Sequence, residues 1–302
     1  IKTNPKLSKM MKVAPEGFDD TKKKFIITID TEGDRLWSWK PGDLITTENT
    51  MYLNRFQKIA EYYGFKPVWL TNYEMIMDDR FIEFIGDVTS RNMGEIGMHL
   101  HAWNSPPLYN LPQGKNGQPY LIEYPTEIME EKIKNMTDII KSKTGIQPVS
   151  HRAGRWATDE RYFKILDKYG YLVDCSVTPH KDWSSYCGQT INSAGSNYKN
   201  ASEMPGLIKG TNIIEIPVSI VYSHKLVHHI KDGIKPVVKD LFFGRDLWLR
   251  PGNDNLNAML YVLEKVKNSN NDYIMFMLHS SEMMPNGSPN FPDNESIEKM
   301  YD

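Results

Sequence analysis

The feature that most restricts the fold of this 302-residue chain is a repeated alternation between short β-rich runs and longer amphipathic stretches. A short, apolar, β-branched run is typical of a buried strand, whereas apolar residues spaced three and four apart indicate a helix. Neighbouring parallel strands need a crossover connection, and that connection is usually a helix. The alternation therefore predicts an α/β protein with a parallel sheet.

About seven runs match the strand pattern, and longer helical stretches separate most of them. The predicted strands cover residues 25–30, 67–71, 95–101, 148–152, 171–175, 213–218 and 273–279. The predicted helices cover residues 47–63, 73–90, 126–144, 159–169 and 255–267. At this length a closed or distorted barrel is favoured, and an open doubly wound sheet is the alternative. We expect a polar N-terminal segment over residues 1–24 and one domain over residues 25–302.

Composition excludes several classes of protein. The 36 Lys and Arg residues oppose 38 Asp and Glu residues, so the basic face of a nucleic-acid binder is not expected. The longest apolar runs fall well short of the roughly 18–20 residues that span a bilayer.

Cys175 and Cys187 are too few for a disulfide framework and are predicted to be ordinary thiols. No signal peptide follows Ile1, which predicts a cytoplasmic protein unless a leader has been removed. The sequence identifies no protein partner.

Ionisable residues are gathered where predicted strands end, which is where active sites lie in parallel α/β proteins. His99 and His101 are two residues apart, so both imidazoles point to the same face of a strand. Two histidines and one carboxylate, with open positions left over, form the ligand set of a catalytic metal site. Two unrelated surface or core histidines are the alternative interpretation.

The same two-residue spacing places Asp30 and Glu32 on one face, although a solvated acidic turn would have the same pattern. A carboxylate that does not bind the metal can take a proton from water. His279 ends a different strand and is placed to protonate a leaving amine. Arg152 would hold the base ionised through a charge-assisted hydrogen bond, and a surface ion pair is its alternative.

Tryptophans follow these segments and suggest a substrate. Trp37 and Trp39 come after the acidic residues, Trp103 after the histidine pair, and Trp156 after Arg152. Flat apolar walls suit the C–H faces of a sugar ring, whereas rings that cap the core beneath the loops would need no ligand.

These ordered motifs resemble the polysaccharide deacetylase family, the carbohydrate esterase family with the NodB-homology domain. The resemblance covers roughly residues 25–285. Residues 28–34 resemble the first motif, usually TFDD, and residues 97–101 the second, while residues 151–156 and 277–280 resemble the third and the last. Within the family the sequence most resembles the lipopolysaccharide-biosynthesis deacetylase-like branch.

The resemblance implies a distorted (β/α)7 barrel, a divalent metal (usually Zn²⁺) and hydrolysis of N-acetyl groups on an amino-sugar glycan. That glycan would be a cell-envelope polysaccharide or a lipopolysaccharide-type precursor. By matching positions, Asp30 is implied as the base and Arg152 as the residue that orients it. His99 is implied as a metal ligand and His279 as the acid. Leu278 is implied to line the pocket for the acetyl methyl group.

Two motifs depart from the family pattern. Thr31 stands where the family has a second aspartate, a metal ligand, so Glu32 is predicted to take that role, with Asp34 as the fallback. The family's histidines are usually four residues apart, but that position is Trp103, so His101 is predicted as the second ligand, and a different mode of metal binding is the alternative. The fourth motif has two candidate matches, residues 246–248 and Asp174.

Two other functions remain as alternatives. The loss of the usual aspartate at Thr31 favours a catalytically impaired glycan-binding protein on the same fold. A different metal-dependent C–N hydrolase of the amidohydrolase type also uses two histidines separated by one residue. That family, however, carries the pair on its first strand and a catalytic aspartate on its last.

Overall fold

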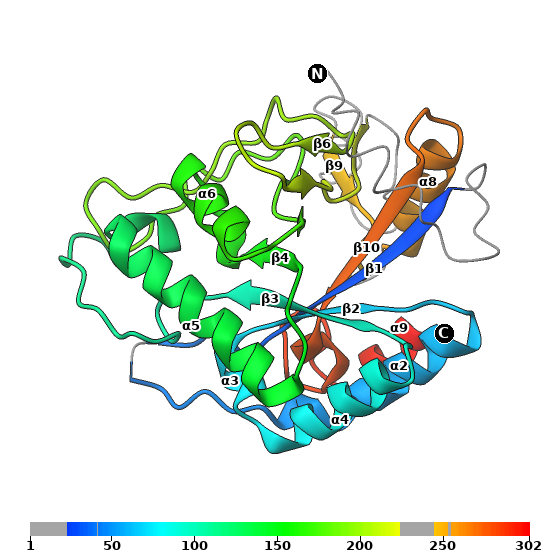
Figure 1. The fold of residues 1–302 in the computed structure, drawn as a ribbon. Helices are drawn as coiled ribbons and strands as arrows, with labels where there is room; N and C mark the ends of the chain where they lie inside the picture. Colours follow the sequence, from blue (N-terminus) through cyan, green and yellow to red (C-terminus); the bar gives the residue numbers. More distant parts are fainter. Residues whose placement is uncertain (1–22, 41, 224–244, 253–254) are drawn as a thin grey trace.

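The computed structural model describes residues 23–40, 42–223, 245–252 and 255–302 (Figure 1). Residues 1–22, most of the predicted polar N-terminal segment, lie outside the described residues, and the boundaries of the single domain stay a prediction. The strands are β1 (Lys24–Thr31), β2 (Val68–Thr71), β3 (Glu95–Leu100), β4 (Ser150–Ala153), β5 (Val173–Asp174), β6 (Gly206–Leu207), β7 (Ile214–Glu215), β8 (Ile220–Ser223), β9 (Arg245–Trp248) and β10 (Tyr273–His279). The α-helices are α2 (Leu53–Tyr62), α3 (Tyr73–Ile76), α4 (Asp79–Ser90), α5 (Thr126–Thr144), α6 (Glu160–Lys168), α8 (Leu256–Lys267) and α9 (Asn294–Tyr301). Short 3-10 helices are η1 (Glu48–Tyr52), η2 (Leu121–Glu123), η3 (Gly154–Trp156) and η5 (Ser280–Met283).

The main sheet has the strand order β10-β1-β2-β3-β4-β5-β7-β6. All of these strands pair in parallel except β6, which is antiparallel to β7. Each predicted strand corresponds to one of the parallel strands, so the predicted α/β class is confirmed. Figure 1 shows β1 and β10, which come from opposite ends of the sequence, side by side at the centre of the molecule.

The sheet curls into a distorted barrel, as predicted. In the described part of the chain, β7 and β10 do not pair, and the antiparallel ribbon β8–β9 lies between them instead. The Met275 N–H donates to Ser219 Oγ (2.8 Å), and the Met277 N–H donates to the Leu249 carbonyl (3.2 Å). The residues next to the ribbon thus provide hydrogen-bond acceptors for backbone N–H groups of β10, which is the last strand at one end of the main sheet. The sequence did not predict the ribbon, which has little apolar periodicity.

Several helices match their prediction closely, and α5 has the predicted bounds. The single helix predicted for residues 73–90 is wrong, because it is divided into α3 and α4. The Asp78 carboxylate accepts a hydrogen bond from the Arg80 N–H (2.9 Å), so it caps a new helix instead of continuing the first. The C-terminal α9 was not predicted; it lies beside α2, where Arg55 pairs with Glu298 at 2.5 and 2.7 Å (Figure 1).

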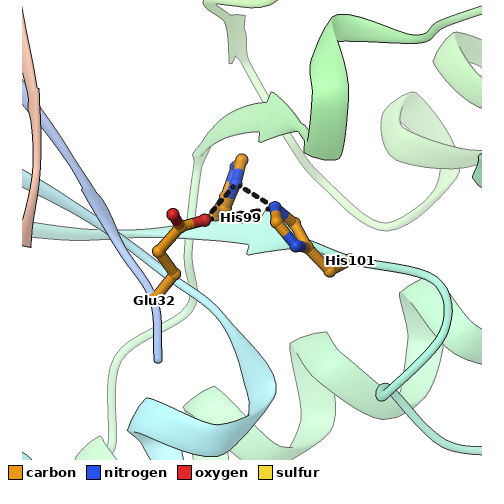
Figure 2. Close-up of side chains that lie close together, drawn as sticks. All are labelled: Glu32, His99 and His101. Atoms are coloured by element: carbon orange, nitrogen blue, oxygen red, sulfur yellow. Dashed lines mark hydrogen bonds and ion pairs between the residues drawn. The ribbon is translucent and has the colours of Figure 1, made fainter. Parts of the chain in front are cut away.

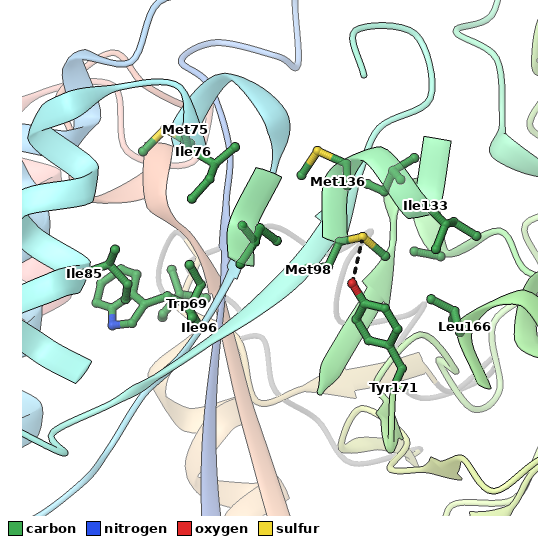
Figure 3. Close-up of a cluster of buried hydrophobic side chains, with 14 of the residues drawn as sticks. Trp69, Met75, Ile76, Ile85, Ile96, Met98, Ile133, Met136, Leu166 and Tyr171 are labelled. Carbon is green, nitrogen blue, oxygen red and sulfur yellow. Dashed lines mark hydrogen bonds between the residues drawn. The ribbon is translucent and has the colours of Figure 1, made fainter. Parts of the chain in front are cut away.

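The largest core cluster lies between the sheet and the helices (Figure 3). Trp69 on β2 and Met98 on β3 are fully buried and pack with side chains from α4, α5 and α6. The Tyr171 hydroxyl donates to the Met98 sulfur at 3.3 Å, which satisfies a polar atom inside the core. Burial of each large apolar side chain stabilises the fold by about 1.5–3 kcal/mol. Among the described helices, none combines the length and apolar character that crossing a bilayer requires.

The register of the parallel strands places the candidate site residues at paired positions on neighbouring strands. Asp30 on β1 pairs with His279 on β10, and His99 on β3 pairs with Arg152 on β4. All four lie within two residues of the carboxyl end of their strand. The fold therefore brings them to one edge of the sheet before any side-chain contact is considered.

Gly97 on β3 is a test of this close strand packing. A Cβ added there would lie 2.3 Å from Ser150 Oγ and 2.8 Å from the Ser150 carbonyl oxygen. We expect Gly97→Ala to lower the free energy of unfolding by about 1–3 kcal/mol, because overpacking forces β3 and β4 apart. Gly86 on α4 is the matched control, since an added Cβ meets nothing within 4 Å. Gly86→Ala should raise stability by about 0.5–1 kcal/mol in the same denaturation experiment, and equal effects at both positions would contradict the packing argument.

Candidate active site

Three buried side chains converge at the ends of β1 and β3 (Figure 2). His99 Nε2 lies 2.8 Å from His101 Nε2. Glu32 Oε2 lies 3.5 Å from the first of these nitrogens and 3.2 Å from the second. Ligand atoms bound tetrahedrally at about 2.0–2.2 Å from one zinc ion are roughly 3.3 Å apart. The three predicted ligands therefore form a group of the size that a divalent cation requires.

The two histidines are held in different ways. His99 Nδ1 lies 2.9 Å from the Arg152 carbonyl oxygen, so this nitrogen carries the proton and donates it, leaving Nε2 with a free lone pair. Metal-binding histidines usually make such a bond through their second nitrogen. His101 Nδ1 is buried and has no hydrogen-bond partner among the described residues. Its backbone N–H donates to Asn72 Oδ1 at 3.3 Å.

Electrostatics distinguish the same two rings. Burial, together with the charges of His99 and His279, lowers the pKa of His101 well below its ordinary value, so this ring is neutral and can bind a metal. Burial also lowers the pKa of His99, but Asp30 and Glu32 outweigh it, so the net shift is upward. The carboxylates thus attract positive charge to the group, which either a proton or a metal cation can supply.

Asp30 lies beside the metal-ligand group and is bound to Arg152. Its Oδ1 accepts a hydrogen bond from Arg152 Nη1 at 2.5 Å, with both side chains buried. Burial alone would raise the pKa of Asp30, but Arg152 and then His99 reverse the effect and lower it. The guanidinium is itself fixed by the Cys175 carbonyl (2.8 Å) and the Thr28 hydroxyl (2.9 Å). Asp30 is therefore ionised at neutral pH and held in one orientation.

His279 faces the group from β10. Its Nε2 lies 3.8 Å from Asp30 Oδ2 and 4.0 Å from Glu32 Oε1. Its Nδ1 lies 3.0 Å from Glu282 Oε2 and 3.0 Å from Arg250 Nη2. A protonated Nδ1 donates to the glutamate, and an unprotonated Nδ1 accepts from the arginine. The Arg250–Glu282 pair, at 2.9 Å, therefore accommodates both states of the ring.

Of the residues predicted to bind the substrate, some lie beside the candidate catalytic side chains and others are packed beneath them. The Trp37 ring is 46% exposed and lies 4.8 Å from the His279 ring. The Trp103 ring lies 4.2 Å from the His101 ring. Trp156 packs under the Arg152 guanidinium and against Trp248, and Leu278 has no exposed surface. Their roles in substrate binding stay predictions, with Trp37 and Trp103 the better placed.

The positions that depart from the family motifs have local explanations. Asp34, the fallback ligand, lies outside the metal-ligand group because its carboxylate accepts hydrogen bonds from Thr46, Glu48 and Asn49. The Thr31 hydroxyl donates to the carbonyl of Ile29, two residues back on the same strand.

The aspartates of both candidates for the fourth motif have partners other than His279. Asp174 lies 2.5 Å from the buried His151, and Asp246 pairs with Lys181 at 2.9 Å. The carboxylate beside His279 is Glu282 instead.

The sequence interpretation missed four residues that support the site. Glu282 is three residues after His279, a spacing that was visible, but Arg250 had no recognisable signal. Asn72 directly follows a predicted strand and caps α3, as residues of its type often do. Glu74 accepts hydrogen bonds from the Gly33 N–H (2.6 Å) and from Asn104 Nδ2 (2.5 Å). Burial raises the pKa of Glu74 to about 7, and the charge of Glu32 adds to the shift.

Comparisons with known proteins support the fold. No protein-family model matches the sequence, and no curated protein matches it. A structure assigned as a polysaccharide deacetylase from Mycobacterium smegmatis matches with a TM-score of 0.50 and 13% identity, over 92% of this chain and 83% of that one. The chain shares the fold of polysaccharide deacetylases.

Other chemistries occur among the similar structures. A GH57 branching enzyme from the archaeon Thermococcus kodakaraensis also has a TM-score of 0.50, with 10% identity, over 92% of this chain and 67% of that one. A structure assigned as a polysaccharide deacetylase involved in O-antigen biosynthesis, from Bordetella bronchiseptica, has a TM-score of 0.41 and 11% identity, over 88% of this chain and 77% of that one. The two matches with a TM-score of 0.50, at 13% and 10% identity, establish the fold alone, and the chemistry has to be argued from the site.

Metal binding tests the three-residue group directly. We expect the purified protein to bind about one equivalent of Zn²⁺, because its three ligand atoms have the spacing of a single site. His99→Ala should abolish tight binding in isothermal titration calorimetry. His180→Ala is the matched control, since His180 pairs with Glu203 and lies outside the group. Equal loss of binding in both variants would show that the ion binds elsewhere.

Proposed function

We propose that this protein is a metal-dependent hydrolase that removes N-acetyl groups from amino-sugar residues of a glycan. One observation carries the proposal: Glu32, His99 and His101 are mutual neighbours, while Asp30 and His279 lie beside them without joining the group. Amide hydrolysis requires activation of the carbonyl, a base for water and an acid for the leaving amine. The arrangement provides a separate set of residues for each task.

Glu32, His99 and His101 would hold the cation, and Zn²⁺ is the ion that a set of two histidines and one carboxylate most simply suits. When bound, such a cation supplies a Lewis acid that polarises a carbonyl group and makes water more acidic. The donor set fits a cation because the three donor atoms face one another and lie within 4.8 Å of one another.

Asp30 is proposed as the base. Arg152 occupies Oδ1, which leaves Oδ2 on the side facing His279 as the oxygen that can accept a proton from water. The same guanidinium lowers the pKa of Asp30, so its carboxylate is ready to accept the proton at neutral pH. Arg152 therefore acts by orienting Asp30 and by keeping it charged.

His279 is proposed as the acid that protonates the leaving amine. When its Nδ1 accepts a hydrogen bond from Arg250, the ring proton of the neutral imidazole is on Nε2, the nitrogen nearer to Asp30. When both nitrogens are protonated, Nδ1 can donate to Glu282. The pair of residues behind the ring thus supports proton transfer through Nε2.

The glycan would lie across the exposed edge of the site. A cavity of about 390 Å³, within the range of ligand pockets, is lined by Arg35, Trp37 and Ser38 and by residues 286–289 and 292. Trp37 connects this cavity to His279, and its ring offers an apolar face to a sugar. A cell-envelope polysaccharide or a lipopolysaccharide-type precursor would present acetamido sugars in this way.

Glycoside chemistry, suggested by the branching enzyme of similar fold, fits the residues less well. It requires one carboxylic acid that stays protonated and a second carboxylate across the scissile bond. Here the pKa of Asp30 is lowered by Arg152 against the effect of burial, and Glu32 is directed at two histidines. The catalytically impaired alternative rested on Thr31, and Glu32 beside the histidines argues against it.

Acetate release tests the reaction. We expect the Zn²⁺-loaded protein to release acetate from N-acetylglucosamine oligomers or from an acetylated lipid-linked glycan. Asp30→Asn should reduce the rate by about 10²–10⁴-fold, because it removes general-base catalysis. Acetate is measured enzymatically under steady-state conditions.

The control is Asp138→Asn on the exposed face of α5, where the aspartate pairs with Lys134. This variant should keep the full rate. Full activity in Asp30→Asn would remove Asp30 from the mechanism. Sugar binding without acetate release by the unmodified protein would favour the glycan-binding alternative.

A further inference from the structure

Lys132 of α5 is a fully buried lysine that the proposed chemistry does not use. Its ammonium donates to three backbone carbonyl oxygens: Ala102 at 2.9 Å, Ser105 at 2.5 Å and Pro107 at 2.6 Å. An ammonium has three N–H donors, so each has one acceptor in a single loop. No carboxylate forms a salt bridge with it among the described residues, and burial lowers the pKa of Lys132 to about 8. Burying a charged group is unfavourable unless it is paired or hydrogen-bonded, and here backbone carbonyls compensate the ammonium.

The three carbonyls belong to residues 102–107, the segment that directly follows the second metal ligand. Ser105 Oγ donates to the His101 carbonyl oxygen at 2.9 Å, and the Tyr124 hydroxyl donates to the Ala102 carbonyl at 3.4 Å. Without the ammonium, the buried carbonyl of Ser105 and the partly buried carbonyl of Pro107 would each lose a donor, which is unfavourable. Lys132 therefore stabilises one conformation of this segment.

His101 depends on that conformation more than His99 does. A hydrogen bond to the Arg152 carbonyl orients the His99 ring, but His101 Nδ1 has no such partner in the described structure. The His101 ring is held by its backbone and by packing against Trp103 on one side. A Cβ added at Gly154 would lie 2.6 Å from His101 Cδ2, so η3 also closely confines the ring.

We propose that Lys132 is a positioning residue for the candidate metal centre: its ammonium anchors residues 102–107 and thereby directs His101 toward Glu32 and His99. Among the described residues, the hydrogen bonds of the Lys132 ammonium go to backbone carbonyls and not to the three ligand side chains, so its effect passes through the backbone. The inference rests on the proposed function only in taking these three residues as a metal site. It makes Lys132 matter for cation affinity as well as for folding.

The test compares Zn²⁺ affinity across variants by isothermal titration calorimetry, with the metal alone as the ligand. Lys132→Met keeps the length of the side chain and removes the ammonium. We expect it to weaken Zn²⁺ binding by about 10-fold or more, as loss of support around a ligand does. The visible absorption spectrum of bound Co²⁺ should change as well, because the His101 ring is no longer held in one orientation.

Thr137→Val is the matched control on the same helix. Thr137 is buried, and its hydroxyl bonds to Ile133 and Tyr171 instead of to the loop. This variant should lose stability in thermal denaturation and keep the Zn²⁺ affinity and the Co²⁺ spectrum of the unmodified protein. The comparison separates a role at the metal centre from a general contribution to folding.

The outcomes are distinct. If Lys132→Met folds and binds Zn²⁺ as tightly as Thr137→Val, Lys132 is only structural and the proposal is overturned. If Lys132→Met does not fold, Lys132→Gln decides, because its amide can serve two of the three carbonyls and should weaken binding to a smaller degree. If the unmodified protein binds no Zn²⁺, both this inference and the proposed function fail. If it binds Zn²⁺ but releases no acetate, only the proposed function fails.

Discussion

The buried ion pair between Arg152 and Asp30 is the interaction on which the rest of the site depends. It joins β4 to β1 across the interior of the barrel, where neither charge would be stable without the other. Arg152 also uses its backbone, because its carbonyl oxygen fixes the ring of His99. One residue thus orients the proposed base through its side chain and a proposed metal ligand through its main chain. A change in the position of β4 would disturb both.

The second histidine has a different kind of support. His99 lies within a strand, where neighbouring backbone is close enough to bind its ring, whereas His101 lies just beyond the strand end. The loop that follows His101 is fixed by Lys132 from α5, and the backbone N–H of His101 itself is bound by Asn72, directly after β2. The site therefore combines a rigid half, built on strands, with a half whose geometry depends on a buried ammonium.

Much of this arrangement could be predicted from local pattern. The alternation of strand and helix residues indicated the parallel sheet, and the spacing at strand ends indicated His99 and His101 as a pair, with Asp30 and Glu32 as the carboxylates that could join them. The interruption at Asp78 was not recognised, because a capping aspartate also fits within an amphipathic helix. The ribbon β8–β9 and the helix α9 had no strong periodicity to reveal them. Arg250 and Lys132 were missed because their partners are 29 and 25–30 residues away in sequence.

The sequence by itself determined which residues could do chemistry, since period-two spacing decides which side chains share a face of a strand. It also determined the order in which most strands and helices follow one another along the chain, because apolar periodicity reflects local backbone geometry. Only the tertiary structure decided which carboxylate faces the histidines and which faces Arg152. It also decided that Glu282, and neither candidate aspartate, supports His279. Those choices depend on distances between strands and loops that are set when the sheet curls, and no local pattern encodes them.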